Sequence, residues 1–396
     1  MTIAQERVHR TLRIRRRSDA PFWLNVLVRV FAIALALLLV GIVLNFSGME
    51  PIALGRKAIV QTLGGAYGLQ QAAILATPLI MTGLAVNVGM RMRLWNIGAD
   101  GQLYLGAFAA TGVALFVKGP PALMLVVMFF AGAIGGALWI LVPAVLRAFW
   151  NVNEIITTLL LNFVAVLLIN HFAIGAWRDT GAAILSATPK LPYLLPSIGK
   201  SYMTYGIFIP IIMAILIQMV LHNTQWGYEV RVIGGSRGVA EFAGIPVLRH
   251  ILIVLLFSGA LAGLAGMIEV SATALRLSGT LSNNYGYMGI IVAALANGSP
   301  LGVVLAGFLL AALLNAGIVL QTSGLSVSAM LAINGVILIF AAIGEVATQY
   351  KISLEKIQES ADDAVQIDAH HEIENETEPA VEIETEVQSR PEELQP

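Results

Sequence analysis

The sequence predicts an all-α, polytopic membrane protein that crosses the bilayer many times. Of its 396 residues, 57% are hydrophobic and only 12% are charged, whereas soluble domains average about 25% charged residues. Runs of roughly twenty apolar residues, long enough to cross a bilayer as helices, recur along most of the chain. This pattern indicates one helical bundle with polar tails rather than two or three soluble domains.

About ten apolar segments are predicted to be transmembrane helices, and together they define a membrane domain at residues 24–347. The segments are 24–46, 70–90, 94–117, 121–146, 153–173, 203–221, 250–270, 283–297, 301–320 and 327–347. The eighth is the weakest, because its apolar part, GIIVAALA, is short and ends in the sequence NGSP.

The two ends of the chain carry opposite charge. Residues 1–23 form a basic segment, and the full-length apolar run that follows it lacks a small-residue cleavage site, so we expect a retained first span. Residues 351–396 contain 3 Lys and Arg against 14 Asp and Glu. With no aromatic residue and little apolar periodicity, this region cannot bury enough surface to offset chain entropy. We therefore expect residues 348–396 to be an acidic, disordered, cytoplasmic tail.

Positive charges predict the orientation of the chain. With a cytoplasmic N-terminus, fourteen Lys and Arg fall in inner segments and seven in outer segments. This bias places both termini, and the polar insert at 227–250, in the cytoplasm. Ten spans divide into five and five, and an odd number per half is the topology of an inverted repeat; we infer this repeat from the count alone.

The insert GYEVRVIGGSRGVAEFAGIPVLRH (227–250) lies between two long apolar runs. Ser236 is a suitable helix N-cap, Gly244 suits a left-handed helix end, and Pro246 prevents continuation. A helix of about two turns is predicted, too short to be stable alone in water.

The same short helix is predicted to be amphipathic. Val239, Phe242 and Ala243 fall on one face, and Arg237 and Glu241 are spaced for an i, i+4 pair on another. Two interpretations remain open: the helix rests on lipid headgroups, or it fits a cleft on a cytoplasmic protein.

The stretch GGSRGVAEFAGI, followed by an apolar span, resembles the coupling loop of ABC importer permeases. More narrowly, it is similar to the branched-chain amino acid, simple-sugar and nucleoside permease family, where the stretch commonly has Asn-Pro at the place of Arg237-Gly238, and a Tyr near Phe242. The resemblance implies that an ATPase contacts this loop. The implied coupling residues are Gly235, Arg237, Ala240, Glu241, Phe242, Gly244 and Ile245.

Three further motifs share this resemblance over most of residues 60–347. RLWNIGADGQLYLGAF (93–108) is similar to the family's Asn-Ile-Gly-Ala-Glu-Gly-Gln block, with Asp100 where Glu is usual. NVNEIITTLLLNFVA (151–165) and LANGSPLGVVLAG (295–307) are similar to two more of its blocks. The nucleoside branch of the family fits best.

Polar residues inside the apolar segments are candidates for a substrate path. Glu154, Thr158 and Asn162 are spaced i, i+4 and i+8 on one helix face, and such groups rarely face lipid. They either line a translocation path or hydrogen-bond neighbouring helices, at about 0.6 kcal/mol per bond. We favour a helix-capping role for Glu154 through the helix dipole and a path role for Asn162.

The sequence NIGADGQ (96–102) interrupts an apolar segment, which is typical of backbone that lines a cavity or packs on protein. Asn96, Asp100 and Gln102 are path candidates here, although Asp100 also suits the first turn of a helix. Elsewhere, Gly132/Gly136 and Gly259/Gly263 are small-xxx-small pairs, which favour close helix packing.

Several chemistries are excluded by what the sequence lacks. It has no cysteine, so disulfides and thiolate metal sites are impossible. It has no G-x-x-x-x-G-K-[ST] motif, the loop that cradles nucleotide phosphates. We find no metal-ligand cluster and no catalytic constellation, so we expect no enzyme, no cofactor on this chain and no nucleic-acid partner; ATP and Mg would bind a partner ATPase.

These observations predict the permease subunit of an ABC importer that moves a nucleoside or simple sugar across a bacterial inner membrane. The implied partners are a cytoplasmic ATPase, a second permease chain, identical or homologous, and an external solute-binding protein that meets the loop 175–202, which could instead merely connect two spans. The alternative is an ion-coupled secondary transporter that uses Glu154, Asp100 or Glu269. The Asn and Thr residues suit a polar, uncharged ligand.

Overall fold

The computed structural model describes residues 8–16, 22–181 and 186–358. The chain forms two units, a helical unit of residues 27–345 and a smaller unit that combines both chain ends.

Each of the ten predicted spans coincides with a helix, and helices α2, α8 and α9 are additional. In chain order the elements are β1 (Val8–Arg16), α1 (Phe22–Phe46), α2 (Pro51–Leu63), α3 (Ala66–Met90), α4 (Ala99–Phe116), α5 (Pro121–Trp150), α6 (Glu154–Ile174), η1 (Tyr205–Ile207), α7 (Phe208–Asn223), α8 (Gln225–Gly235), α9 (Arg237–Phe242), α10 (Val247–Ile268), η2 (Glu269–Thr273), α11 (Tyr285–Leu295), α12 (Pro300–Gln321), α13 (Val327–Gln349) and β2 (Tyr350–Gln358).

Seven helices among the described residues are long and apolar enough to cross a membrane. They are α3, α5, α6, α7 with η1, α10 with η2, α12 and α13. Thus a polytopic helical protein is confirmed, whereas the count of ten spans and the inverted repeat are not. The eighth predicted span shows why: α11 has only 11 residues, about 17 Å of helix. Asn297 and Gly298 adopt left-handed φ angles of 46° and 79°, and end this segment.

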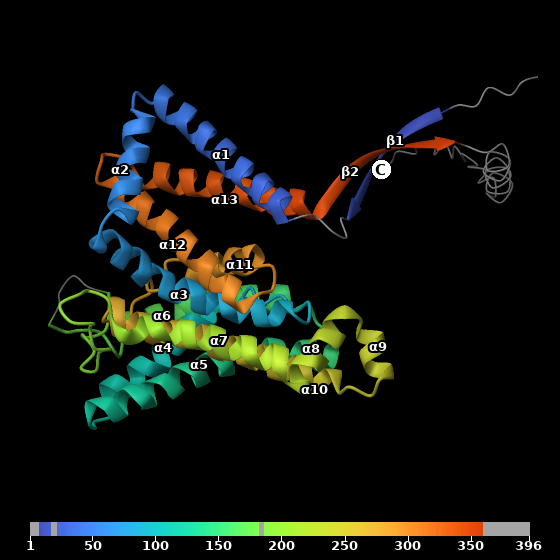
Figure 1. Ribbon diagram of the computed structural model, residues 1–396. Helices are drawn as coiled ribbons and strands as arrows, with labels where there is room; N and C mark the ends of the chain where they lie inside the picture. The colour runs from blue at the N-terminus through green and yellow to red at the C-terminus, as the bar shows by residue number, and fades with distance from the viewer. Residues whose placement is uncertain (1–7, 17–21, 182–185, 359–396) are drawn as a thin grey trace, which may run out of the picture. The chain divides into compact units, whose positions relative to one another are not determined.

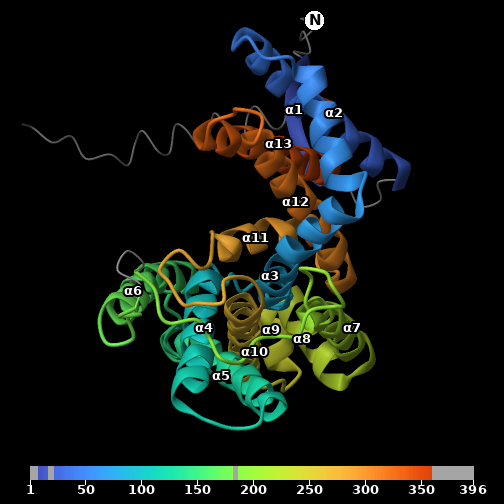
Figure 2. The same ribbon diagram turned by 90° about the vertical axis from the view of Figure 1, so that its left-hand side faces the viewer.

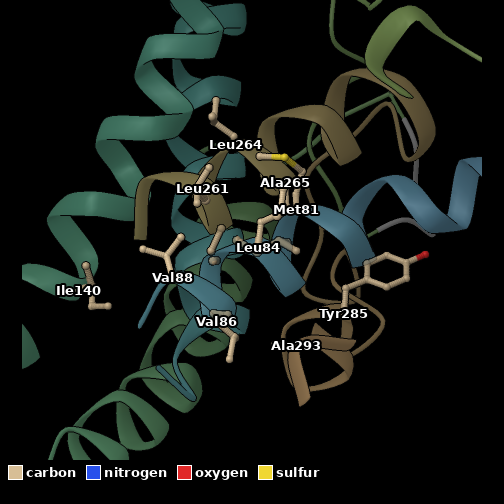
Figure 3. Close-up of a cluster of buried hydrophobic side chains, with 14 of the residues drawn as sticks. Met81, Leu84, Val86, Val88, Ile140, Leu261, Leu264, Ala265, Tyr285 and Ala293 are labelled. Carbon is tan, nitrogen blue, oxygen red and sulfur yellow. The ribbon is translucent and has the colours of Figure 1, made fainter. Parts of the chain in front are cut away.

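Helices α3 and α10 form the centre of the helical unit. About 83% of the α3 span and 72% of the α10 span are buried, against 22% for α5 and α6. Helix α3 packs against α10, α11 and α12, and α10 packs against α4 and α5 (Figures 1 and 2). In the core, Met81 and Leu84 of α3 lie near Leu261 and Leu264 of α10 (Figure 3). The outward faces of α5 and α6 are rich in exposed apolar side chains, as lipid-facing helices require.

The predicted close packing of glycine pairs is confirmed between α5 and α10. A Cβ atom added to Gly136 would lie 2.2 Å from the carbonyl oxygen of Gly259, and one added to Gly263 would lie 2.2 Å from that of Gly132. Because these positions have no side chains, the two backbones are in van der Waals contact. In lipid there is no hydrophobic driving force between helices, so such close packing is what stabilises their association.

The two chain ends form an antiparallel strand pair, which the sequence reading missed. Strand β1 pairs with β2 in a register that runs from Val8↔Gln358 to Arg16↔Tyr350. Residues 350–358, which we assigned to a disordered tail, are therefore part of a sheet. The average composition of residues 348–396 obscured a short period-2 alternation, in which Ile352 and Leu354 occupy alternate positions. Residues 359–396 lie outside the described residues.

Candidate functional site

The polar insert folds into two short helices between α7 and α10 (Figure 1). Helix α8 is capped by Thr224, whose side chain accepts a hydrogen bond from the amide of Gly227 at 3.1 Å. Helix α9 is capped by Ser236, which accepts from the amide of Val239 at 3.4 Å. The sequence prediction of Ser236 as an N-cap is thereby confirmed.

Helix α9 ends where the sequence predicts it. Gly244 has a φ of +75°, a conformation that glycine adopts at little cost. The amide of Ile245 donates to the carbonyl of Ala240 at 3.0 Å, and that of Gly244 donates to Glu241 at 3.1 Å. These two bonds satisfy carbonyl groups that a helix end leaves open, and they fix the direction in which the chain enters α10.

The two faces of α9 differ sharply in exposure. Ala240 is buried against the bundle, whereas Phe242 is 97% exposed and Val239 is 60% exposed. Arg237 and Glu241 form the predicted i, i+4 ion pair at 2.8 Å, worth about 0.3–0.5 kcal/mol on an exposed helix. The apolar tip of α9 therefore has no packing partner among the described residues.

The base of the insert, in contrast, is firmly attached to the bundle. A carboxylate oxygen of Glu229 of α8 lies 2.8 Å from Nε2 of the buried His250 of α10, whose Nδ1 lies 3.0 Å from the carbonyl oxygen of Pro246. Gly234 packs so closely that an added Cβ would lie 1.9 Å from the carbonyl oxygen of Arg91. Helix α8 is therefore in direct contact with α10 and with the segment after α3.

Arg91 extends this connection to the other half of the bundle. Its guanidinium donates to the carbonyl of Gly298, in the turn between α11 and α12. Burial, together with the nearby positive charge of Arg231, lowers the pKa of Arg91 below its usual value. Arg231 in turn donates to the carbonyl of Leu221 at the end of α7. Arg91 thus connects the segment after α3 to the turn before α12, and Arg231 connects α8 to the end of α7.

The NIGADGQ segment forms a buried hydrogen-bonded cluster at the start of α4. The side-chain amides of Asn96 and Gln102 bond to each other in both directions, at 2.7 and 2.8 Å. Asn96 also donates to Ser258 of α10 at 2.8 Å, and Ser258 donates to the carbonyl of Ala85 of α3 at 2.5 Å. This cluster holds α3, α4 and α10 together.

Asp100 lies in the first turn of α4. From the sequence we considered this position for Asp100 beside a role in the substrate path. Its carboxylate accepts hydrogen bonds from the hydroxyl of Ser282 and from the amide of Gly286, the latter at 3.0 Å. An added Cβ on Gly286 would lie 2.1 Å from the backbone nitrogen of Asp100. Asp100 therefore joins the starts of α4 and α11.

Asn162 of α6 is hydrogen-bonded to the same NIGADGQ segment. Its side chain accepts from the amide of Gly101 at 2.8 Å and donates to the carbonyl of Ile97 at 2.9 Å and to the hydroxyl of Tyr287 at 3.1 Å. Thr158 bonds within its own helix, to the carbonyl of Glu154 at 2.6 Å.

Glu154 occupies the first turn of α6, as we favoured from the sequence. The helix cap itself comes from Asn153, which accepts from the amide of Ile155 at 2.9 Å. The carboxylate of Glu154 accepts from the amide of Trp95 at 3.2 Å and forms an ion pair with Arg147 at 3.1 Å. Glu154 thus ties α5 and α6 to the segment before α4.

The five predicted path residues therefore share one buried region. Asn96, Asp100, Gln102 and Asn162 bond to one another or to adjacent backbone around the start of α4, and Thr158 packs beside Gly98. That these side chains line a substrate path stays a prediction.

We expect Asn162→Leu to lower thermal stability more than transport per folded molecule. The substitution leaves the Gly101 amide and the Ile97 carbonyl buried and unpaired, at a cost of about 1–3 kcal/mol each. Thr157→Val is the matched control, because the hydroxyl of this exposed-side residue bonds only to carbonyls of its own turn. Thermal unfolding and ATP-driven uptake of the purified complex measure both effects. Normal stability with lost uptake would instead support the path role.

A feature that the sequence reading missed is a cavity of about 300 Å³ at the far end of α10. It is lined by α3, the segment around η1, and the residues where α10 passes into η2. Its lining residues are drawn from three parts of the chain, so no local motif marks it. The clearest local signal would have been the sequence EVSAT (269–273), which places three polar residues directly after the apolar run of α10.

Comparison with protein families agrees with this arrangement. The family model described as "Branched-chain amino acid transport system / permease component" matches residues 68–342. The chain belongs to this family. The match includes α9 and the whole hydrogen-bonded network around α4, and it confirms the family resemblance drawn from the sequence motifs.

Individual relatives of this permease are named for sugars and nucleosides. The glucose ABC transporter permease protein TsgB13 of Haloferax volcanii is 33% identical over 85% of this chain and 92% of its own length. The guanosine permease NupP of Bacillus subtilis is 32% identical over 73% and 84%. The nucleoside permease NupB of Lactococcus lactis is 27% identical over 81% and 91%. No solved structure matches the chain.

Proposed function

We propose that this ABC transporter permease imports a nucleoside or simple sugar, and that a separate ATPase drives it by docking on α8 and α9. The observation that carries the proposal is the exposed tip of α9. Phe242 is 97% exposed on a six-residue helix that is too short to be stable without a partner surface. An aromatic side chain of this kind is the usual anchor of a protein interface.

The rigid attachment of the insert supports the same proposal. A displacement of Phe242 would move α10, because the bonded helix end at Gly244 leads directly into α10. It would also move α8, because Glu229 of α8 contacts His250 of α10. The chain lacks the phosphate-binding G-x-x-x-x-G-K-[ST] loop, so ATP and Mg belong to the partner. The insert then lies on the cytoplasmic side, with both termini, in a multi-pass chain of the bacterial inner membrane.

Two further partners follow from the proposal. A second permease chain, identical or homologous, would pair with this one, and a solute-binding protein would meet the loop 175–202 on the opposite side. The proposal is supported by bonds that attach the described part of this loop to the segment after α10. The amide of Leu191 donates to Leu275 at 3.0 Å, and Asp179 forms an ion pair with Arg276 at 2.8 Å. Such a braced loop offers a defined docking surface.

The contacts of two of the three candidate carboxylates argue against the alternative of ion coupling. Asp100 accepts from Ser282 and Gly286, and Glu154 accepts from Trp95 and pairs with Arg147.

The deciding experiment is uptake into vesicles that contain the purified complex. We expect guanosine or glucose uptake to require ATP and to fall to background when the general base of the partner ATPase is substituted, Glu→Gln. The unsubstituted complex is the control, and an imposed proton or sodium gradient is the competing driving force. Uptake by this chain alone, driven by an ion gradient, would contradict the proposal.

A further inference from the structure

We propose that the cavity at the end of α10 is a binding site for the transported solute, and that it takes a neutral, hydroxyl-rich ligand with one apolar face, such as a nucleoside or a hexose. The inference rests on the proposed function, because it locates and characterises the solute site of the same permease. The cavity has a volume of about 300 Å³, at the lower end of the ≈ 300–1,000 Å³ range of small-molecule pockets.

The lining of the cavity combines uncharged polar groups with aliphatic surface. Gln71 and Thr77 of α3 share it with Tyr202 and Thr204 of the segment before η1 and with Thr273 of η2. None of the described residues that line the cavity carries a charge. A nucleotide or an amino acid would leave its charges unpaired here, at high cost, whereas hydroxyls and amides suit the hydroxyl groups of a neutral solute.

Aliphatic side chains supply the other side of the cavity. Ile74 lies one turn from Gln71 on α3. The other apolar lining residues are Met203, Ile207, Ile268, Ala272 and Leu275. A mostly apolar pocket with a few polar groups that fix orientation is the usual form of a small-molecule site. The planar face of a base or the CH face of a sugar ring would contact this surface.

The backbone at the cavity is irregular, as sites inside membrane helices often are. Where α10 ends, the amide of Ala274 donates to the carbonyl of Glu269 at 2.9 Å, an i→i−5 bond of a π-helix. Single π-helical turns occur frequently at functional sites. The loop after α6 secures this turn, since the amide of Leu195 donates to the carbonyl of Ser271 at 3.0 Å.

One buried carboxylate lies next to the lining. Glu269 is 4% exposed and belongs to η2, as does Thr273, which lines the cavity. Glu269 itself is not part of the lining.

The cavity also lies where solute binding can affect the coupling insert. Helix α10 begins at Val247, directly after α9, and reaches the cavity at Ile268, about 33 Å along the helix. Gly206, next to the lining segment, packs against Ile268, since an added Cβ would lie 3.1 Å from that side chain. A single central helix thus connects the cavity with the docking tip.

The chain has no cysteine, which allows a clean labelling test in the complete complex. In Thr204→Cys, we expect guanosine or glucose, whichever the complex imports, to slow labelling by N-ethylmaleimide at least threefold. Ser197→Cys is the matched control, because Ser197 pairs with Thr204 across an isolated β-bridge but does not line the cavity. We expect no change there.

A second substitution separates solute binding from local structure. Adding Thr273→Val to Thr204→Cys should raise the solute concentration that half-protects the cysteine by roughly three- to tenfold, as for the loss of one hydrogen bond. Thr111→Val, at a buried threonine of α4 away from the cavity, should leave it unchanged.

The outcomes distinguish this inference from the proposed function. If the complex imports a solute with ATP but that solute protects neither cysteine, or protects both equally, the cavity is not its binding site. If Thr273→Val and Thr111→Val shift half-protection equally, the cavity assignment is also overturned. If no ATP-driven uptake of guanosine or glucose occurs, the proposed function fails and this inference fails with it.

Discussion

Phe242→Asp is expected to abolish ATP-driven uptake while leaving the folded permease intact. Phe242 is 97% exposed, so its ring contributes almost nothing to the stability of the chain itself. In an interface it would be a central apolar anchor, and loss of such an anchor typically costs at least about 2 kcal/mol, or roughly 30-fold in affinity. A buried carboxylate adds a desolvation cost. Uptake, ATPase stimulation by solute and thermal unfolding of the complex measure the result.

Two controls make this prediction specific. Phe242→Leu keeps an apolar tip and should retain most of the uptake. Phe46→Asp changes an equally apolar side chain at the end of α1, 87% exposed, and should not disturb ATPase binding. Normal uptake by Phe242→Asp, or equal losses in all three variants, would exclude α9 as the docking element and favour the alternative that it rests on lipid.

The insert could be read from sequence because its signals are local. The N-cap Ser236 and the left-handed Gly244 lie within eight residues of each other, and each acts on adjacent backbone groups. The positions of the apolar helices were equally predictable, since hydropathy is a property of a single segment. Which helices are central was not, because the α10 and α12 spans have the same mean hydropathy, 2.5, but are 72% and 39% buried.

The polar network could not be read in the same way, because its bonds join distant parts of the chain. Asp100 is bonded by Ser282, and Asn162 by Tyr287, across separations that spacing rules do not cover. A polar group in an apolar helix indicates only that it faces protein or water. The sequence does not show which groups lie opposite such a side chain, so it cannot choose between the two. The strand pair β1–β2 also joins distant parts of the chain, which adds to the masking effect of the acidic tail's average composition.

Substituting Gly136 with leucine is expected to prevent assembly of the α5–α10 interface. A Cβ atom at this position would lie 2.2 Å from the carbonyl oxygen of Gly259 and 2.7 Å from the Cα of Gly263. These are backbone atoms of a central helix, so relief requires α5 and α10 to separate. Overpacking by a methylene or two typically costs 1–3 kcal/mol; a whole leucine against backbone should exceed this and leave little folded protein.

Two further variants test this explanation: one adds a smaller side chain at position 136, and the other adds leucine at a different glycine. Gly136→Ala should lower the melting temperature by several degrees, since about 1–3 kcal/mol shifts a large domain by roughly 2–4 °C per kcal/mol. Gly335→Leu is the matched control, because a Cβ on this glycine of α13 meets nothing within 4 Å and helix propensity improves. Fluorescence-detected size exclusion measures folded yield. If Gly136→Leu and Gly335→Leu gave equal yields, close backbone contact between α5 and α10 could not be what holds the centre of this permease together.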